Sequence, residues 1–203
     1  MALLQVRTLA PKVRLGLWRI EETEEQLVAL LGGSESMAMQ GVKNYRSSCR
    51  RIEVLAVRAL LWAMTGQRDS CILHGSAGQP LLEGQYISIS HTEGYAAIIL
   101  SEEQQVAIDI EWMSDRIRRV ATKFLLPDEL SDSTIELLRR WCVKETVYKY
   151  FPTAQLEYFD MHILSPQDGA TERVVEVLPL QRQVRVVTEV TSCYVLSYIF
   201  LNS

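Results

Sequence analysis

The segment YISISHTEGYAAIILSEEQQVAIDIEW, residues 86–112, decides the fold more than any other part of the chain. Side chains alternate in character over residues 86–91 and again over 106–112, and this period of two predicts β-strands. Between them, residues 95–100 form an apolar run that follows a Thr-Glu-Gly turn. A strand, a tight turn and a partner strand predict a hairpin, with a third strand next along the chain.

The sequence before this segment predicts one strand and then helices. Residues 5–20 alternate enough to predict a first strand, and residues 21–31 predict a short helix that opens with acidic residues. Residues 45–65 place apolar side chains at helical spacing, and Gly66 is a typical helix end.

The sequence after it repeats the order of helices and then strands. Residues 116–125 form an amphipathic pattern, and residues 128–151 contain a long helical one. From residue 162 onward several alternating runs predict strands. We therefore expect an α+β protein of two similarly organised halves, residues 1–105 and 106–203.

The composition narrows the class of protein. A formal net charge of −4 argues against general nucleic-acid binding, which needs a basic face. No apolar run is long enough for a membrane span or a signal peptide. The four cysteines have neither CxxC nor zinc-finger spacing, and unpaired cysteines fit the cytoplasm.

Two carboxylates close the strand predicted over residues 106–112. Asp109 and Glu111 lie two residues apart, so they point to the same face of the strand, about 7 Å apart. Ile108 and Ile110 point to the opposite face. Two neighbouring carboxylates repel each other, and a hard cation such as Mg²⁺ would relieve that repulsion. A solvated strand face would carry the same pattern.

The long helix carries a second group of charged residues. Trp141, Lys144 and Glu145 fall at i, i+3 and i+4, on one face, and Lys149 follows about one and a half turns later. Lysines beside an acid suit a phosphate next to a metal ion. An ordinary amphipathic helix with a solvated face is the alternative.

A histidine and an arginine complete the candidates. Ser90 and His91 end the first alternating strand and enter a turn, where an imidazole can meet a phosphate. Arg58 lies inside the apolar run VLAVRALLWAM, so it must reach a partner or solvent. That partner could be an anionic ligand or an acid of the chain itself.

These blocks resemble the 4′-phosphopantetheinyl transferases of the surfactin-synthetase-activating (Sfp) type. The resemblance spans roughly residues 50–150 and rests on blocks in a fixed order. They are VLAVRALL with GQP, ISISHTEGYAAIIL, VAIDIEWMSDR, FLLPDE and WCVKETVYKY. It implies transfer of the 4′-phosphopantetheine arm of coenzyme A to a serine of an apo acyl or peptidyl carrier protein, with release of 3′,5′-adenosine bisphosphate. It also implies two α+β halves related by a pseudo-twofold, with coenzyme A in the cleft between them, in a chain that works as a monomer.

The resemblance also implies roles for single residues. Asp109, Glu111 and Glu145 match the family's Mg²⁺ ligands, and Glu145 is placed to accept the proton of the carrier serine. The remaining matches are to groups that contact coenzyme A: Lys144 and Lys149 at the pyrophosphate, Ser90 and His91 at the phosphates, and Arg58 near the adenosine 3′-phosphate. Two positions depart from the family pattern. Gln79 stands where lysine is common, which puts a contact to the nucleotide in doubt, and Thr146 stands where alanine or serine is usual.

Carrier proteins are typically acidic, so a basic docking surface is expected. Its candidates are Arg116, Arg118, Arg119, Lys123, Arg139 and Arg140. Two rival functions remain. Another Mg²⁺-dependent phosphoryl-transfer enzyme is disfavoured because no P-loop or GxGxxG is present, and a non-catalytic carrier-binding homologue is disfavoured by the intact acids.

Overall fold

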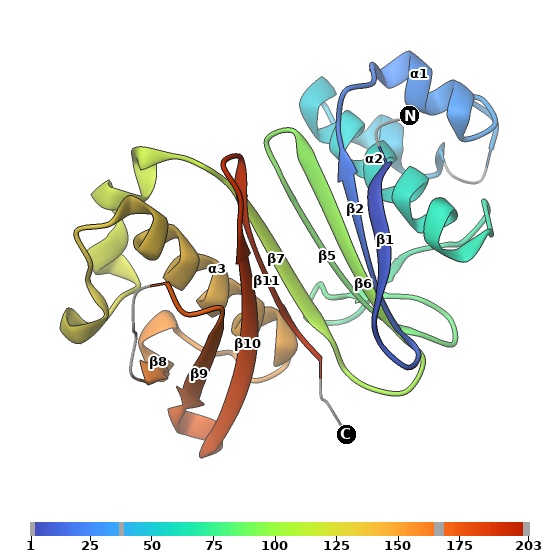
Figure 1. Cartoon of the computed structure of the whole chain (residues 1–203). Coiled ribbons are helices and arrows are strands. Elements are labelled where there is room, and N and C mark those ends of the chain that lie inside the picture. Colours follow the sequence, from blue (N-terminus) through green and yellow to red (C-terminus); the bar gives the residue numbers. More distant parts are fainter. Residues whose placement is uncertain (1–2, 37–38, 165–168, 201–203) are drawn as a thin grey trace.

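Two antiparallel sheets form the centre of the molecule, and a helix layer covers the outer face of each (Figure 1). The computed structural model describes residues 3–36, 39–164 and 169–200. The mixed α+β class expected from the sequence is therefore confirmed. Within the described ranges, no helix is both long enough and apolar enough to cross a membrane.

The first sheet has the strand order β1-β2-β6-β5. Its strands are β1 (Leu3–Ala10), β2 (Val13–Arg19), β6 (Tyr95–Ser101) and β5 (Tyr86–Thr92). The single strand expected over residues 5–20 is wrong, because the chain reverses at Lys12, whose φ is 61°. The hairpin predicted from the opening segment is confirmed as the β5–β6 pair.

The N-terminal helices pack on this first sheet. They are α1 (Glu24–Leu30), the short 3₁₀ helix η2 (Val42–Asn44) and α2 (Ser48–Thr65). Gly66 ends α2 in the left-handed conformation with φ 73°, as predicted, and Ser47 caps its start at Ser48, three residues after the predicted beginning. The inner face of α2 buries Leu60 and Met64 against the sheet. Two short strands, β3 (Leu73–His74) and β4 (Pro80–Leu81), follow it.

The second sheet has the strand order β7-β11-β10-β9-β8. Its strands are β7 (Ala107–Trp112), β8 (Met161–Leu164), β9 (Glu172–Val177), β10 (Arg182–Val190) and β11 (Tyr194–Ile199). Helix α3 (Thr134–Tyr150) covers its outer face. The short 3₁₀ helix η6 (Tyr158–Asp160) leads from α3 into β8, and η7 (Leu178–Leu180) joins β9 to β10.

The amphipathic helix expected over residues 116–125 does not form. The chain instead makes three 3₁₀ turns: η3 (Asp115–Arg119), η4 (Ala121–Lys123) and η5 (Pro127–Glu129). Val120 and Phe124 leave the helical region, with φ of −122° and −139°. This break turns the Phe124 ring inward, where it is buried against Trp141. Tertiary packing thus overrides the local helical pattern.

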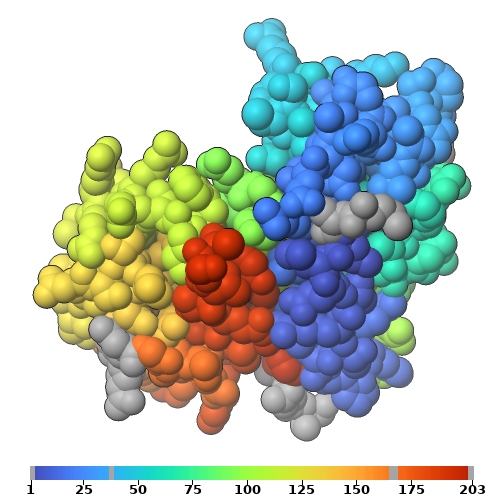
Figure 2. Space-filling model, turned by 45° about the horizontal axis from the view of Figure 1, so that its top comes forward, coloured from blue at the N-terminus to red at the C-terminus, as the bar shows by residue number. Residues whose placement is uncertain are grey.

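The inner faces of the two sheets pack on each other through an apolar core. That core includes Leu15 and Ile99 from the first sheet and Ile108 and Ile110 from the second. Figure 2 shows the two groups of strands meeting on one face, where β1 (dark blue) lies beside β10 and β11 (red). The ion pair between Arg7 and Glu189 joins β1 to β10 there. Ile108 and Ile110, which the sequence places on the face opposite the acids, are both fully buried.

Strands β5 and β7 connect the two sheets through side chains. Ser88 Oγ accepts a hydrogen bond from Ile108 N at 3.1 Å, and Thr92 Oγ1 accepts one from Trp112 N at 3.2 Å. Between them, Ser90 Oγ donates to Asp109 Oδ1 at 2.8 Å. The polar face of the alternating strand β5 therefore sets where the acids of β7 lie. The chain passes from the first sheet to the second between residues 101 and 107. The division into residues 1–105 and 106–203 and the pseudo-twofold between them stay predictions.

Candidate active site

A cavity of about 420 Å³ lies where α2, β5, β7 and α3 approach one another. We call it the charged cavity. All the site residues expected from the sequence except Lys144 line it: Arg58, Ser90, His91, Asp109, Glu111, Glu145 and Lys149. Segments more than 80 residues apart in the chain thus contribute to one site.

Asp109 is the most deeply buried acid of this cavity, with 3% of its surface exposed. Its Oδ1 atom accepts hydrogen bonds from Lys149 Nζ at 2.6 Å and from Ser90 Oγ at 2.8 Å. Its Oδ2 atom is buried and has no hydrogen-bond partner among the described residues. A buried carboxylate oxygen without a partner is costly, so it is a natural place for a cation.

The surroundings of Glu111 and Glu145 disfavour the ionised forms of both carboxyl groups. Burial raises the pKa of Glu111, and the nearby Asp109 carboxylate raises it further. Burial also raises the pKa of Glu145, with a smaller contribution from Asp109. A cation between these groups would favour their ionised forms and reverse both shifts.

The three acids fit the donor chemistry of Mg²⁺, which prefers oxygen ligands. Over the ranges that the structure describes, no three His, Cys, Asp or Glu side chains form a ready-made metal cluster. Mg²⁺ typically uses only one or two carboxylates and takes its other ligands from water and substrate phosphates. Asp109 Oδ2 and the two raised carboxyl pKa values are the observations that favour such a site.

Basic groups face the acids across the cavity. Burial alone would lower the pKa of Lys149, but the Asp109 carboxylate outweighs it and the pKa is raised, so Lys149 stays charged. Burial and the Arg50 guanidinium lower the pKa of His91, with which Arg50 forms a hydrogen bond. Arg58 donates to Gln40 O at 2.8 Å, and burial lowers its pKa. An anionic ligand in this cavity would meet the Arg50 and Arg58 guanidinium groups and the His91 imidazole on its α2 and β5 side, and Lys149 on its α3 side.

Lys144 is placed differently from the sequence expectation. It is fully buried, with 0% exposure, and does not line the charged cavity. Its ammonium donates to Glu129 Oε2 at 2.6 Å, Phe124 O at 2.8 Å and Tyr158 O at 3.1 Å. Three acceptors satisfy its three protons, so this lysine has none left for a pyrophosphate. Adjacent residues of a helix point about 100° apart, which sends Glu145 into the cavity and Lys144 into the core.

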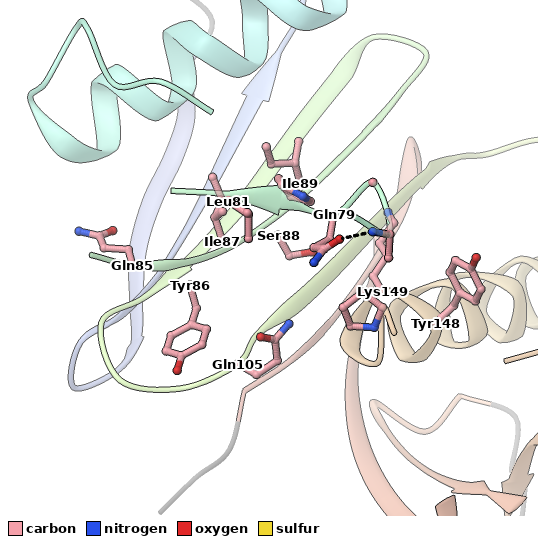
Figure 3. A pocket seen from close by; sticks show the side chains of 14 residues that line it. Gln79, Leu81, Gln85, Tyr86, Ile87, Ser88, Ile89, Gln105, Tyr148 and Lys149 are labelled. Carbon is pink, nitrogen blue, oxygen red and sulfur yellow. Dashed lines mark hydrogen bonds between the residues drawn. The ribbon is translucent and has the colours of Figure 1, made fainter. Parts of the chain in front are cut away.

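A second cavity of about 500 Å³ adjoins the first and shares Lys149, Pro80 and Ile89 with it. We call it the neutral cavity, since Lys149 is the only charged residue among the described residues that line it. Its polar groups include the amides of Gln79, Gln85 and Gln105 (Figure 3). Gln79 Oε1 accepts from Ala77 N at 3.1 Å, so the residue that replaces the family lysine helps to shape the turn beside this cavity.

Several residues of the site were missed in the sequence. Arg50 lies eight residues before Arg58 on the same helix face, a spacing that could have revealed it. Tyr158 donates from its hydroxyl to Glu145 Oε1 at 2.5 Å. No sequence motif marks Tyr158, because a 3₁₀ turn thirteen residues beyond Glu145 brings it back to α3.

The expected basic docking surface is only partly exposed. Arg116, Arg118, Arg119 and Lys123 are exposed on η3 and η4. Arg139 and Arg140 are buried, which contradicts their expected role. Arg139 pairs with Glu136 at 3.0 Å, and Arg140 donates to the Glu129 carbonyl. Their helix face packs against the chain rather than solvent.

Comparison with known proteins finds a similarity over part of the chain. Residues 105–198 match the family model described as the 4′-phosphopantetheinyl transferase superfamily. The match contains Asp109, Glu111, Glu145 and Lys149, and it covers slightly less than half of the chain. The second sheet and α3 are therefore similar to that superfamily of transferases. No curated protein matches the chain.

Proposed function

We propose that this protein transfers the 4′-phosphopantetheine arm of coenzyme A to a serine of an apo acyl or peptidyl carrier protein, as an Sfp-type enzyme. The proposal rests on the superfamily match together with one observation. The three acids of the matched segment face His91, Arg50 and Arg58 of the unmatched half across one cavity. Acids beside basic groups suit a Mg²⁺ ion together with the phosphates of coenzyme A.

We assign the acids Asp109, Glu111 and Glu145 to Mg²⁺. When bound, Mg²⁺ would neutralise charge on the pyrophosphate and stabilise the departing bisphosphate. Lys149 would contact the same phosphates from the side of Asp109. His91, Arg50 and Arg58 would bind the nucleotide end of coenzyme A, because they line the α2 and β5 side of the same cavity.

The chemical step needs a base for the serine hydroxyl. Glu145 lines the charged cavity beside the acids that we assign to Mg²⁺, so its carboxylate could accept the proton of a serine bound there. The serine oxygen would attack the phosphorus that carries the pantetheine arm, and its proton would pass to Glu145. The bond from that phosphorus to the bridging oxygen would break, and 3′,5′-adenosine bisphosphate would leave.

The neutral cavity suits the arm itself. The arm is uncharged and carries two amides and a hydroxyl, and glutamine amides and apolar side chains line this cavity. Since both cavities share Lys149, an arm attached to the phosphate could pass from one into the other. The exposed basic residues of η3 and η4 would attract an acidic carrier.

A mass-shift assay tests this function. Purified protein, coenzyme A, Mg²⁺ and an apo acyl or peptidyl carrier should give a carrier heavier by one phosphopantetheine. Asp109→Ala should abolish the shift, because it removes the acid with the unpaired oxygen. Glu172→Ala, on the exposed pair with Arg185, should leave it unchanged. No transfer to any of several apo carriers would contradict the proposal, and normal transfer by Asp109→Ala would refute the metal assignment.

A further inference from the structure

Three aromatic rings lie directly behind the acids of the charged cavity. Phe124 and Trp141 have ring centroids 4.6 Å apart, and those of Trp141 and Tyr158 are 5.2 Å apart. They come from three separate elements, the turn after η4, helix α3 and η6. We call these three residues the aromatic bracket.

The bracket presents one hydrogen-bond donor to each of two acids. Trp141 Nε1 donates to Glu111 Oε1 at 2.9 Å, and Tyr158 OH donates to Glu145 Oε1 at 2.5 Å. In both acids the second oxygen is left to other partners. Glu111 Oε2 accepts only a long bond from Thr92 at 3.4 Å, and no described residue bonds to Glu145 Oε2.

We infer that Trp141 and Tyr158 are positioning residues that orient Glu111 and Glu145 toward a divalent cation. Both donors are neutral, so they fix a carboxylate without cancelling the negative charge that the cation needs. Lysine or arginine at either position would orient the acid equally well but compete with the cation. The inference rests on the cation site of the proposed function, and adds two residues that act through its acids.

Lys144 supports the bracket from behind. Its ammonium holds the backbone carbonyls of Phe124 and Tyr158, the residues on either side of Trp141 in the cluster. Glu129 neutralises it and also accepts from Leu126 N at 2.8 Å and Ile163 N at 2.7 Å. The buried pair therefore ties η5, α3, η6 and β8 together at the base of the bracket. Lys144 is thus a positioning residue rather than a phosphate ligand.

Removal of each donor tests the bracket. Tyr158→Phe loses only the hydroxyl, whereas Trp141→Phe keeps an aromatic ring but loses the indole N–H together with the ring that carries it. Mn²⁺ binding, measured by the electron paramagnetic resonance of free Mn²⁺ with coenzyme A present, should weaken roughly 10- to 100-fold in each variant. In the transfer assay, kcat should fall while KM for coenzyme A stays nearly unchanged, because Lys149, His91 and Arg58 remain in place.

The chain offers a matched control for each variant. Trp18 Nε1 donates to Glu22 Oε2 at 3.2 Å, and Tyr198 OH donates to Glu189 Oε1 at 2.8 Å, both outside the two cavities. Trp18→Phe and Tyr198→Phe remove bonds of the same kinds and should leave Mn²⁺ affinity unchanged. Mn²⁺ affinities of Trp141→Phe and Tyr158→Phe equal to those of their controls would overturn the inference.

A double variant tests Lys144, since Lys144→Met alone would leave Glu129 charged and buried and could prevent folding. Lys144→Met with Glu129→Gln removes both charges and keeps an acceptor for Ile163 N. It should weaken Mn²⁺ binding while calorimetric affinity for 3′,5′-adenosine bisphosphate is kept. A large loss of that affinity would show Lys144 to be a phosphate ligand. Mn²⁺ binding without transfer by the wild type would refute the proposed reaction alone, and no Mn²⁺ binding would refute both.

Discussion

Glu111 shows how burial changes a side chain that looks ordinary in the sequence. Its pKa is raised by burial first and by Asp109 second, while hydrogen bonds from Trp141 and Thr92 lower it. Because the pKa of Glu111 is raised overall, the folded protein disfavours ionisation of its carboxyl group. The motif DxE predicts two acids on one face of a strand, but it does not show whether that face is buried or exposed to solvent.

We predict that the unfavourable ionisation of Glu111 makes the stability of the folded protein depend on pH. The unfolded carboxyl ionises near its ordinary pKa of 4.5, and the folded one ionises only at a higher pH. Stability contributed by the protonated form is therefore full below about pH 4.5 and is lost as pH rises through the folded pKa. Glu111→Gln removes that loss. Without divalent cations, its thermal midpoint should exceed that of the wild type at pH 7.5 by more than at pH 4.

The exposed Glu172 provides the control. Glu172→Gln makes the same change at an exposed acid outside both cavities, and its thermal midpoint at pH 7.5 should stay close to that of the wild type. Added Mg²⁺ should narrow or reverse the advantage of Glu111→Gln at pH 7.5, because the ion stabilises the wild-type carboxylate. An advantage equally large at pH 4 would contradict the sign of the pKa shift.

Strand β5 connects the two sheets through its side chains. Ile87 and Ile89 pack toward α2, while Ser88, Ser90 and Thr92 reach strand β7. The alternation YISISHT predicts a two-faced strand, and that prediction is confirmed. Alternation alone could not show that the hydroxyl face meets a strand of the other sheet instead of water.

Ser88→Ala should measure how much the contact between β5 and β7 contributes to the stability of the protein. The change leaves the buried amide of Ile108 without its acceptor, which costs about 1–3 kcal/mol. In a protein of this size that lowers the thermal midpoint by roughly 2–4 °C for each kcal/mol. Differential scanning calorimetry checks it, with exposed Ser76→Ala as the control. An unchanged thermal midpoint for Ser88→Ala would mean that the contact between β5 and β7 contributes little to stability.

At the scale of the whole molecule, we propose that the charged cavity binds the nucleotide of coenzyme A and the neutral cavity binds its arm. Two ligands can test this assignment. Coenzyme A carries the arm, and 3′,5′-adenosine bisphosphate lacks it. Gln105 lies in the loop between β6 and β7 and lines only the neutral cavity (Figure 3). Gln105→Trp should therefore fill the space that we propose for the arm.

Calorimetry should find coenzyme A binding to Gln105→Trp weakened about 10-fold or more, about 1.4 kcal/mol, with binding of the bisphosphate unchanged. Gln183→Trp, exposed on β10, should bind both ligands like the wild type. Equal weakening of both ligands would place the nucleotide in the neutral cavity, and no weakening of either would place the arm elsewhere. In both cases the transfer reaction itself would still stand.

Local pattern was enough for much of this molecule. The α+β class, the β5–β6 hairpin, the C-terminal end of α2 and the acids of β7 follow from periodicity, capping residues and turn residues, which act between neighbours in the chain. Where the chain departs from its pattern, the cause lies far away. Residues 116–125 give up a helix so that Phe124 can pack on Trp141 and Tyr158.

Tertiary structure alone decided which of two adjacent charged residues reaches the site. Lys144 and Glu145 look equivalent in the sequence, yet one is paired with Glu129 in the core and the other lines the charged cavity. It also decided that Tyr158 and Arg50 belong to the site. The reason is physical: a charge is stable in the interior only where partners satisfy it, and those partners come from distant segments that no local pattern reveals.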